Sequence, residues 1–571
     1  MNSSPSLPLE FSAASREKYV RDLGHLPLDI LVVGGGITGA GIVRDAALRG
    51  YRVGLIEKAD FASGTSSKSS KLIHGGLRYL KNLEFSLVHE ALGERKTLLE
   101  IAPHLVHPLK CLLPVYESDT DPSWMVHLGL LMYDMLSFSK SIGSHQMIEG
   151  EAAESVAPLL RKEGLKQIAQ YYDCGADDFR LVMANVQSAA QAGAVVANYV
   201  RAEDLWREKG TVVGVKATDA LTGARLDIRS HTVVNAAGPW SDQLRKIWEE
   251  EEIPRLRTTK GVHLILSRDR LKILHPIVLP AVSDQRPVFA IPWRRFVVLG
   301  TTDTEYTGDL DRVCPERDDI DYLLDTFNHY FPTVRLTDSD IVSTFAGLRP
   351  LVDEGGKTES RVTREYEIFE GPEAVFSIVG GKLTTYRTMA LEMVDRLRKK
   401  LESSFSVKAA EPRCRTGEQP LYGGEIEDFE QFRETWFERL RQELDLDEEV
   451  ATHLAETYGN ALDIVVPFLA AGPDGSEKIL PDLPFLWGEL DYALAREMTV
   501  GLDDFVIRRT HLFSLDREQG QSIIGEVADR MALALGWSAE EVKRQKSRYL
   551  AKIEVVQGFR GLGRINRSSA S

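Results

Sequence analysis

The chain has 571 residues, of which 43% are hydrophobic and 27% charged, a balance typical of globular proteins. It carries 69 Lys and Arg against 85 Asp and Glu, a formal net charge of −16 at pH 7. Because nucleic-acid phosphates are bound by clustered cations, this excess of acid argues against a nucleic-acid-binding protein. The four cysteines lie far apart without C-x-x-C spacing, which argues against a disulfide framework or a zinc site, and we predict no metal.

The first 28 residues lack the apolar core of a secretory signal, and we expect a short irregular lead-in. No run of 18 apolar residues occurs, so we expect no helix that spans a membrane. The nearest candidate, WMVHLGLLMYDMLSFSK at 124–140, is shorter and contains Asp134. Its apolar residues share one helical face, which fits an amphipathic core helix or a helix lying at a membrane surface.

Residues 29–58, DILVVGGGITGAGIVRDAALRGYRVGLIEK, are typical of a strand, a glycine turn, a helix and a second strand. The helix is predicted to begin at Ile37 and to end before Gly50. A βαβ unit of this size predicts one half of a Rossmann-like nucleotide-binding domain.

Gly34, Gly36 and Gly39 fit the pattern G-x-G-x-x-G. In such a unit the first glycine permits a tight turn, the second lets the backbone approach a pyrophosphate, and the third allows close helix–strand packing. Glu57, at the end of the second strand, is placed to accept hydrogen bonds from an adenosine ribose and disfavours a 2′-phosphate. The pattern predicts a dinucleotide but leaves NAD and FAD open.

Two further glycine-bearing segments favour FAD. FASGTSSKSSKLIHGGLRYL, at 61–80, supplies hydroxyl groups for a long cofactor, although a solvated Ser-rich loop is the alternative. FSIVGGKLTTYR, at 376–387, repeats the strand–glycine–helix theme, although an ordinary turn would look similar. We expect a helix to start near Lys382 and to direct its N-terminal dipole at a flavin ring.

The rest of the chain predicts a mixed middle and a helical end. Residues 209–238 are typical of hairpins that lead into the strand HTVVNAAG, and 295–306 predict another strand and a polar loop. A linker rich in Pro and Gly follows at 403–425, and helical patterns prevail beyond it, with Ser538 a predicted N-cap.

These motifs, together with NAAGPW, TKGVHL, TTDTEYTGD, FAGLRPL and GGKLTTYRTMA, resemble the FAD-dependent glycerol-3-phosphate dehydrogenases of the D-amino-acid-oxidase-like flavoprotein superfamily. The resemblance implies an α/β (α+β) fold, with a Rossmann-like FAD-binding domain, a mixed β-sheet substrate or cap domain and an all-α C-terminal domain. The implied ranges are a lead-in at 1–28, the FAD-binding domain at 29–110, 171–255 and 346–402, the cap at 111–170 and 256–345, a linker at 403–425 and the helical domain at 426–571.

The same resemblance implies oxidation of sn-glycerol 3-phosphate to dihydroxyacetone phosphate, with electrons passed from FAD to a membrane quinone. It implies a cytoplasmic protein held peripherally at the inner face of the cell membrane, and a homodimer is compatible with it. An oxidase that uses dioxygen and makes hydrogen peroxide is the near alternative. An amine or amino-acid oxidase, or a flavin-binding sensor or RNA-associated flavoprotein, is a more distant one.

The cofactor-binding residues expected from motif and resemblance lie in four segments. They are Gly34, Gly36, Ile37, Thr38, Gly39, Glu57, Thr65, Ser66, Ser67, Ser70, Lys71, Leu72, His74, Gly75, Ala237, Gly238, Gly381, Lys382, Leu383 and Thr384.

A dianionic substrate phosphate calls for arginine, whose planar fork binds it through two hydrogen bonds. The predicted substrate ligands are Arg78, Tyr79, Arg349 and Arg364, of which Arg349 is also a candidate catalytic residue.

The reaction also needs a base for the C2 hydroxyl proton, while a hydride leaves C2 for the flavin. His263, Lys260 and His74 are the candidates. If 258–264 form a strand, Lys260 and His263 face opposite sides and only one reaches the substrate. We favour His263 as the base, with Lys260 polarising the alcohol or contacting flavin O4, and His74 touching the flavin or orienting the hydroxyl.

Overall fold

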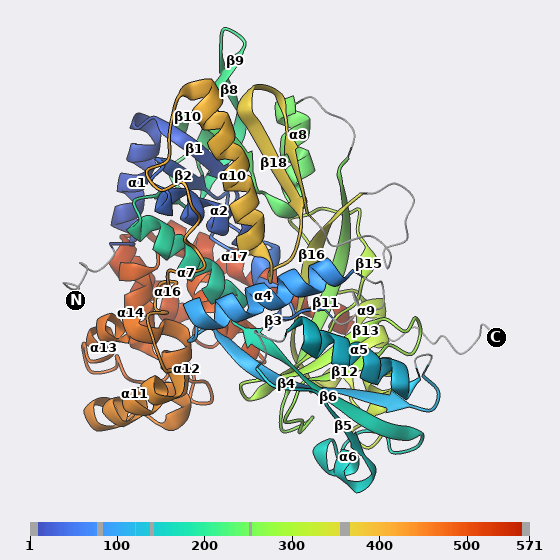
Figure 1. Ribbon diagram of the computed structural model, residues 1–571. Helices are drawn as coiled ribbons and strands as arrows, with labels where there is room; N and C mark the ends of the chain where they lie inside the picture. The colour runs from blue at the N-terminus through green and yellow to red at the C-terminus, as the bar shows by residue number, and fades with distance from the viewer. Residues whose placement is uncertain are drawn as a thin grey trace.

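The computed structural model describes residues 10–76, 84–119, 122–137, 142–249, 254–353 and 366–561. Within these residues, two β-sheets and a set of C-terminal helices meet around one centre (Figure 1). The helices that precede the C-terminal region are α1 (Ala13–His25), α2 (Ile37–Leu48), α4 (Phe85–Ile101), α5 (Ser123–Leu136), α6 (Gly150–Val156), α7 (Asp178–Gln191), α8 (Ser241–Glu249), α9 (Arg317–Tyr330) and α10 (Tyr386–Phe405).

The first sheet contains the predicted Rossmann-like unit. The order of its described strands is β17-β18-β10-β1-β2-β7, with β9 paired to β10 and β8 paired to β9. β1 pairs in parallel with both β10 and β2. β1 is buried along its whole length, as its unbroken apolar run predicts, and α2 packs against α7 and α10. The strands are β1 (Leu28–Val33), β2 (Val53–Ile56), β7 (Val195–Ala197), β8 (Val200–Glu208), β9 (Thr211–Asp219), β10 (Arg225–Asn235), β17 (Tyr366–Glu370) and β18 (Val375–Gly380).

The second sheet is mixed and mostly antiparallel. Its described strands run in the order β15-β11-β14-β13-β12-β4-β6-β3, with β16 paired to β11 and β5 paired to β6. This sheet carries its own apolar core, which α9 helps to close. The strands are β3 (Leu72–Ile73), β4 (Val106–Tyr116), β5 (Gln146–Glu149), β6 (Leu165–Ala176), β11 (Leu256–Ser267), β12 (Ile277–Pro280), β13 (Pro287–Trp293), β14 (Phe296–Gly300), β15 (Thr304–Glu305) and β16 (Ile341–Val352).

The C-terminal region is helical, as the sequence predicts. The Ser538 hydroxyl accepts a hydrogen bond from the backbone N–H of Glu541 at 3.2 Å, which confirms the predicted N-cap. The helices are α11 (Phe429–Leu444), α12 (Glu448–Tyr458), α13 (Leu462–Leu469), α14 (Trp487–Arg496), the π-helix η7 (Asp504–Arg509), α15 (Leu512–Leu515), α16 (Ile524–Leu535) and α17 (Ala539–Gln557).

The prediction of an irregular lead-in was wrong, because α1 occupies residues 13–25 of it. Ser12 and Ser15 cap its first turn through reciprocal hydrogen bonds. Leu23 packs in the core beside the first sheet, and Arg16 forms a buried ion pair with Asp219 at 2.6 Å. The weakly apolar sequence concealed this helix, whose inner face carries a paired arginine among its apolar residues.

Two further expectations differ from the structure. The helix expected near Lys382 begins only at Tyr386, since a turn follows the left-handed glycines 380 and 381. The domain boundaries expected after 110, 170 and 345 fall inside β4, β6 and β16, all of which belong to the second sheet. We therefore propose that the cap segments end with whole strands, because a strand ladder holds each strand within one sheet.

Within the described residues, no helix combines the length and the apolarity that crossing a bilayer requires.

Candidate active site

A cavity of about 1580 Å³ lies where the two sheets and the C-terminal helices meet. This is larger than the roughly 300–1,000 Å³ of common ligand pockets, so a dinucleotide and a small substrate can share it. Most of the predicted site residues line it: Gly34, Gly36, Ile37, Thr38, Glu57, Thr65, Ser66, Ser67, Ser70, Lys71, Leu72, His74, Ala237, Gly238, His263, Arg349, Gly381, Lys382, Leu383 and Thr384.

The glycine motif shapes one end of this cavity. Gly34 has φ +118°, and a Cβ atom there would lie 2.5 Å from the carbonyl oxygen of Ala236. A Cβ atom on Gly39 would lie 1.9 Å from the carbonyl oxygen of Gly34, so only glycine lets α2 approach β1 this closely. The first and third glycines therefore have the structural roles that the motif predicts.

The start of α2 and the end of β2 supply polar groups at the same end. The backbone N–H of Ile37 donates to the Ser66 hydroxyl at 3.0 Å. The Glu57 carboxylate accepts from the backbone N–H groups of Gly35 at 2.7 Å and Ala59 at 2.9 Å. Burial raises the pKa of Glu57, and these two N–H groups counter it and hold the carboxylate at the cavity wall.

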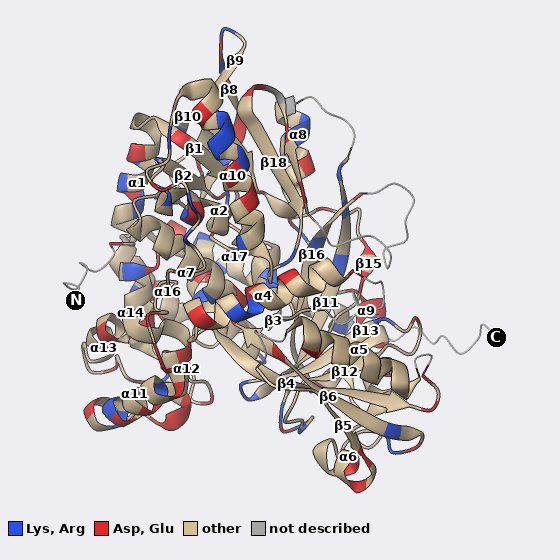
Figure 2. Ribbon diagram, viewed as in Figure 1, with Lys and Arg blue, Asp and Glu red and all other residues tan. Residues whose placement is uncertain are grey.

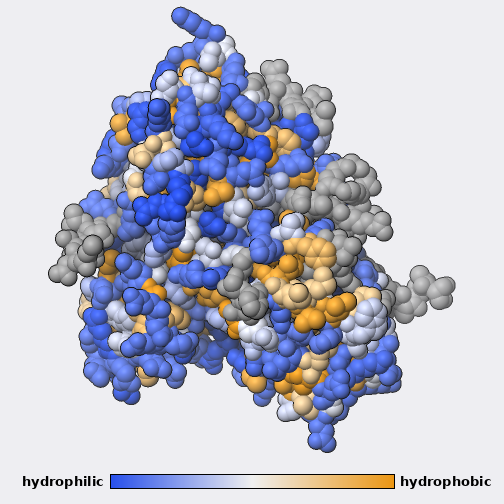
Figure 3. All heavy atoms as spheres, viewed as in Figure 1, coloured by the Kyte–Doolittle hydropathy of each residue, from blue (hydrophilic) through white to orange (hydrophobic). Residues whose placement is uncertain are grey.

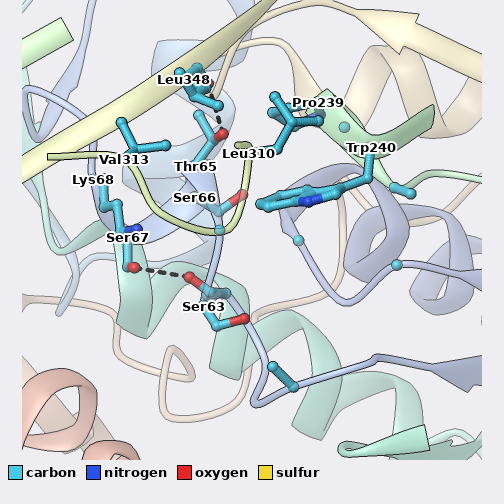
Figure 4. A pocket seen from close by; sticks show the side chains of 18 of the residues that line it. Ser63, Thr65, Ser66, Ser67, Lys68, Pro239, Trp240, Leu310, Val313 and Leu348 are labelled. Atoms are coloured by element: carbon cyan, nitrogen blue, oxygen red, sulfur yellow. Dashed lines mark hydrogen bonds between the residues drawn. The ribbon is translucent and has the colours of Figure 1, made fainter. Parts of the chain in front are cut away.

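The Ser-rich loop forms one wall of the cavity. Figure 4 shows Lys68 and Trp240 on opposite sides of the pocket, with Ser66 between them. The Thr65 hydroxyl donates to the carbonyl oxygen of Leu348 at 2.6 Å, which ties the loop to β16. The Ser67 hydroxyl donates to the carbonyl oxygen of Ala62 at 2.7 Å, so hydroxyl groups of the loop hold it in place along the cavity.

Two paired strands present the central side chains. Residue 263 of β11 lies opposite Phe345 of β16, and residue 259 lies opposite Arg349. Alternate residues of a strand share one face, so His263, Gly261 and Arg349 point into the same cavity. A Cβ atom on Gly261 would lie 2.4 Å from Nη2 of Arg349, so this glycine leaves room for the guanidinium group.

His263 is positioned as a neutral imidazole. Its Nε2 lies 2.8 Å from the Ser70 hydroxyl, and its ring stacks on Phe345 with centroids 4.6 Å apart. Burial, followed by the positive charges of Arg349 and Lys71, lowers the pKa of His263 to about 3. An anionic ligand that offsets the neighbouring cations would raise this pKa and favour protonation of the imidazole.

Arg349 has its guanidinium group oriented by the loop after β14. Nη1 lies 3.1 Å from a carboxylate oxygen of Asp303, and Nη2 donates to the Thr301 hydroxyl at 2.9 Å and the Thr302 carbonyl at 3.1 Å. Its side chain stays 20% exposed, toward the cavity. A fixed guanidinium at an open face suits a phosphate or carboxylate ligand.

The structure corrects two predicted site roles. Lys260 points away from His263, because three residues along a strand reverse the face, and its Nζ pairs with Glu316 at 2.7 Å and Asp319 at 2.8 Å. The expectation that Lys260 polarises the substrate or contacts the flavin is therefore wrong. Gly75 also lies off the cavity wall, and its N–H donates to the Tyr133 hydroxyl at 3.0 Å.

Three predicted substrate ligands, Arg78, Tyr79 and Arg364, lie outside the described residues.

The sequence interpretation missed the contribution of the C-terminal helices. Arg508, His511 and Phe513 line the cavity, beside Trp293 of the second sheet. The His511 Nε2 atom lies 2.7 Å from Asp177, and its ring meets Trp293 edge to face. The stretch DDFVIRRTHLF sets charged groups among apolar residues, as FAGLRPL does around Arg349, and this signal could have been recognised.

Comparison with known proteins identifies the family. Residues 29–387 match the family described as FAD dependent oxidoreductase, over more than half of the chain. The chain belongs to this family. Residues 414–542 match the C-terminal domain of alpha-glycerophosphate oxidase.

Similar proteins cover almost the whole chain. An aerobic glycerol-3-phosphate dehydrogenase of Staphylococcus haemolyticus is 36% identical over 537 residues, which are 93% of this chain and 95% of that protein. A Staphylococcus epidermidis protein of the same name is 35% identical and covers 96% of this chain and 97% of its own. The solved structure of the glycerol-3-phosphate dehydrogenase from Bacillus halodurans complexed with FAD gives a TM-score of 0.81 at 33% identity, covering 97% of this chain and all of that chain. The resemblance inferred from the motifs is confirmed.

The residues present fit FAD, the cofactor of this family. Trp240 Nε1 and His263 Nδ1 are buried without a hydrogen-bond partner, and both residues line the cavity. The Gly36 backbone, the Ser66 hydroxyl and Glu57 offer groups for a pyrophosphate and a ribose at the glycine-rich end. The prediction of FAD is confirmed, and the protein is an FAD-dependent oxidoreductase.

Substitution of Gly39 by Ala is expected to remove most of the bound FAD, because the added Cβ atom forces α2 away from β1. FAD titration followed by fluorescence should give a dissociation constant at least about tenfold weaker, a loss of about 1.4 kcal/mol. The matched control is Gly129→Ala in α5, where no atom lies within 4 Å of the new Cβ atom. Full flavin content in the Gly39 variant would refute this account of the motif.

Proposed function

We propose that this protein oxidises sn-glycerol 3-phosphate to dihydroxyacetone phosphate, and that it passes the electrons to a quinone. The observation that carries the proposal is the shared face of β11 and β16, where a neutral histidine and a partly exposed arginine line the FAD cavity together. The relatives that match over nearly the whole chain are named for the same substrate.

Each residue of that face has one role in the proposal. Arg349 binds the substrate phosphate through its guanidinium fork. His263 accepts the C2 hydroxyl proton at an imidazole nitrogen, and Ser70 fixes the orientation of its ring. Lys71, paired with Asp178 at 2.6 Å, keeps a positive charge beside them. FAD, when bound, supplies the two-electron acceptor.

Dioxygen is the second candidate acceptor, since residues 414–542 match a domain named for an alpha-glycerophosphate oxidase. A quinone is supported by relatives that are named dehydrogenases.

Under nitrogen, sn-glycerol 3-phosphate should bleach the visible absorbance of the flavin, whereas glycerol at the same concentration should not. Arg349→Leu should raise KM by roughly 10–100-fold, because a charge-assisted hydrogen-bonded contact contributes about 1.5–3 kcal/mol. Adding a quinone analogue under nitrogen should restore the colour. Recovery only in air, with peroxide formed, would support the oxidase, and no bleaching at all would overturn the proposed substrate.

The pH dependence of turnover should separate the free enzyme from the substrate complex. The pKa of His263 is about 3 before substrate binds, so kcat/KM should show no acid limb from His263 between pH 5 and 7. A bound phosphate dianion offsets the charge of Arg349 and raises this pKa, so kcat should fall on the acid side at a higher pH than kcat/KM. An acid limb near pH 6.5 in kcat/KM would contradict the burial of a neutral His263.

A quinone acceptor implies contact with a bilayer, which we place at the inner face of the cell membrane. The exposed apolar residues of α5 support a peripheral contact. Trp124 and Met135 are 64% and 69% exposed, and Leu128 and Leu131 are 46% and 44% exposed. Figure 3 shows an apolar patch where Figure 1 places α5, and Figure 2 shows this helix almost free of charged residues. The opposite face of α5 buries Leu130 and Tyr133, so both faces of the helix are apolar.

The double variant Leu128→Glu, Leu131→Glu should bind vesicles of phosphatidylcholine and phosphatidylglycerol at least about tenfold more weakly, since burying each leucine contributes roughly 1.5–3 kcal/mol. Co-sedimentation measures the bound fraction. Leu533→Glu on α16 is the control, because that leucine is 90% exposed and lies far from α5 in the sequence. Equal vesicle binding by the unsubstituted protein, the double variant and the control would exclude α5 as the membrane contact.

A further inference from the structure

Helix α17 has a second face that does not pack into the C-terminal core. On its first face, Tyr549 and Ile553 are buried in the C-terminal core. On the second face, Arg548, Lys552 and Val555 line the cavity. These three positions recur at i, i+4 and i+7, which keeps them on one side of a helix. The C-terminal helix therefore presents a stripe, cationic at one end and apolar at the other, to the ligand cavity.

Lys68, on the Ser-rich loop, completes a cationic cluster at this part of the wall, which we define as Lys68, Arg508, Arg548 and Lys552. Asp503 pairs with Arg548 at 2.9 Å and with Lys552 at 2.5 Å. No described carboxylate forms an ion pair with Lys68. The Arg548 and Lys552 side chains are 36% and 43% exposed, so solvent reaches this end of the cavity.

The charges of the cluster are only partly balanced. Arg508 shares the carboxylates of Asp60 and Asp504, at 2.6 and 2.7 Å, and Arg509 also pairs with Asp60. Burial, followed by repulsion from Lys552 and Arg508, lowers the pKa of Lys68 to about 8, and the charge of Asp311 offsets only part of this effect. A bound anion would supply further negative charge.

The rest of the molecule repels an anionic substrate. The formal net charge is −16, and a phosphate monoester carries up to two negative charges at neutral pH. Cations clustered at a cleft raise the local concentration of an anion, even where the overall charge of the protein repels it. They also raise the rate at which the anion associates. Lys68 lies beside Gly347, two residues before Arg349 on β16, whereas Arg548 and Lys552 come from α17.

We propose that Lys68, Arg548 and Lys552 form an outer phosphate-binding site, which captures the phosphate monoester dianion at the cavity mouth before Arg349 binds it. The identity of the captured substrate rests on the proposed function, whereas the binding of phosphate at this site does not. The loop lysine and the C-terminal helix then act together, so the helical domain contributes to substrate capture.

The test uses the FAD-loaded full chain with Lys68→Met, Lys552→Met and, as a matched control, Lys546→Met. Lys546 is on the same helix and pairs with Asp529 at 3.7 Å. At low ionic strength, kcat/KM for sn-glycerol 3-phosphate should fall by about three- to tenfold in the first two variants, with kcat within twofold. Their dependence on salt should flatten, while the control should match the unsubstituted enzyme.

A binding measurement keeps the outcome independent of turnover. Calorimetry with inorganic phosphate, in an Arg349→Leu background, should detect one site that Lys68→Met weakens by at least about tenfold. Unchanged binding would overturn the proposal even if the enzyme oxidises the substrate. Loss of FAD from the Lys68 variant would also overturn it, since the lysine would then serve the cofactor. Absence of turnover with intact phosphate binding would contradict only the proposed substrate.

Discussion

The buried carboxylate of Asp60 joins the nucleotide-binding sheet to the C-terminal helices. It accepts hydrogen bonds from Arg508 at 2.6 Å, from Arg509 and from Asn198 at 3.0 Å. Burial alone would raise its pKa, but the two arginines outweigh burial and lower it to about 2. Removing one partner of such a buried group costs about 3–5 kcal/mol, because charges remain without compensation. Asp60 follows Glu57 by three residues, so the same contact holds the loop at the ribose end of the cavity.

Three separate parts of the chain contribute one wall each. The first sheet brings the glycine-rich turn and Glu57, the second sheet brings His263 and Arg349, and the C-terminal helices bring Arg508 and the stripe on α17. This arrangement places the guanidinium group of Arg349 and a neutral imidazole in one cavity with the residues that fit FAD. The helical domain is therefore part of the site.

Local sequence patterns predicted those parts of the fold that depend on residues close together in the chain. The G-x-G-x-x-G turn, the start of α2 and the cap at Ser538 depend on neighbouring residues, so a single sequence contains them. The opposite facing of Lys260 and His263 also follows from strand periodicity. FAD was predicted in the same way, because its long chain needs polar groups in several segments.

Longer-range features were not visible in the sequence. The place of α1 depends on an ion pair between residues 16 and 219, and the ends of β4 and β6 depend on pairing with distant strands. The ion pairs of Lys260 with Glu316 and Asp319 could not be read from TTKGVHL. The contact between Arg508 and Asp60 could not be predicted either, since 448 residues separate them in the sequence.

The central claim is that the pairing of Asp60 with the C-terminal arginines maintains the cofactor cavity. The most direct measurement is the FAD dissociation constant of Asp60→Asn, compared with Asp474→Asn, which alters the partly exposed pair with Arg530. We predict FAD binding at least about tenfold weaker for Asp60→Asn and within twofold of normal for the control. A folded Asp60→Asn protein that binds FAD as tightly as the unsubstituted chain would contradict the account.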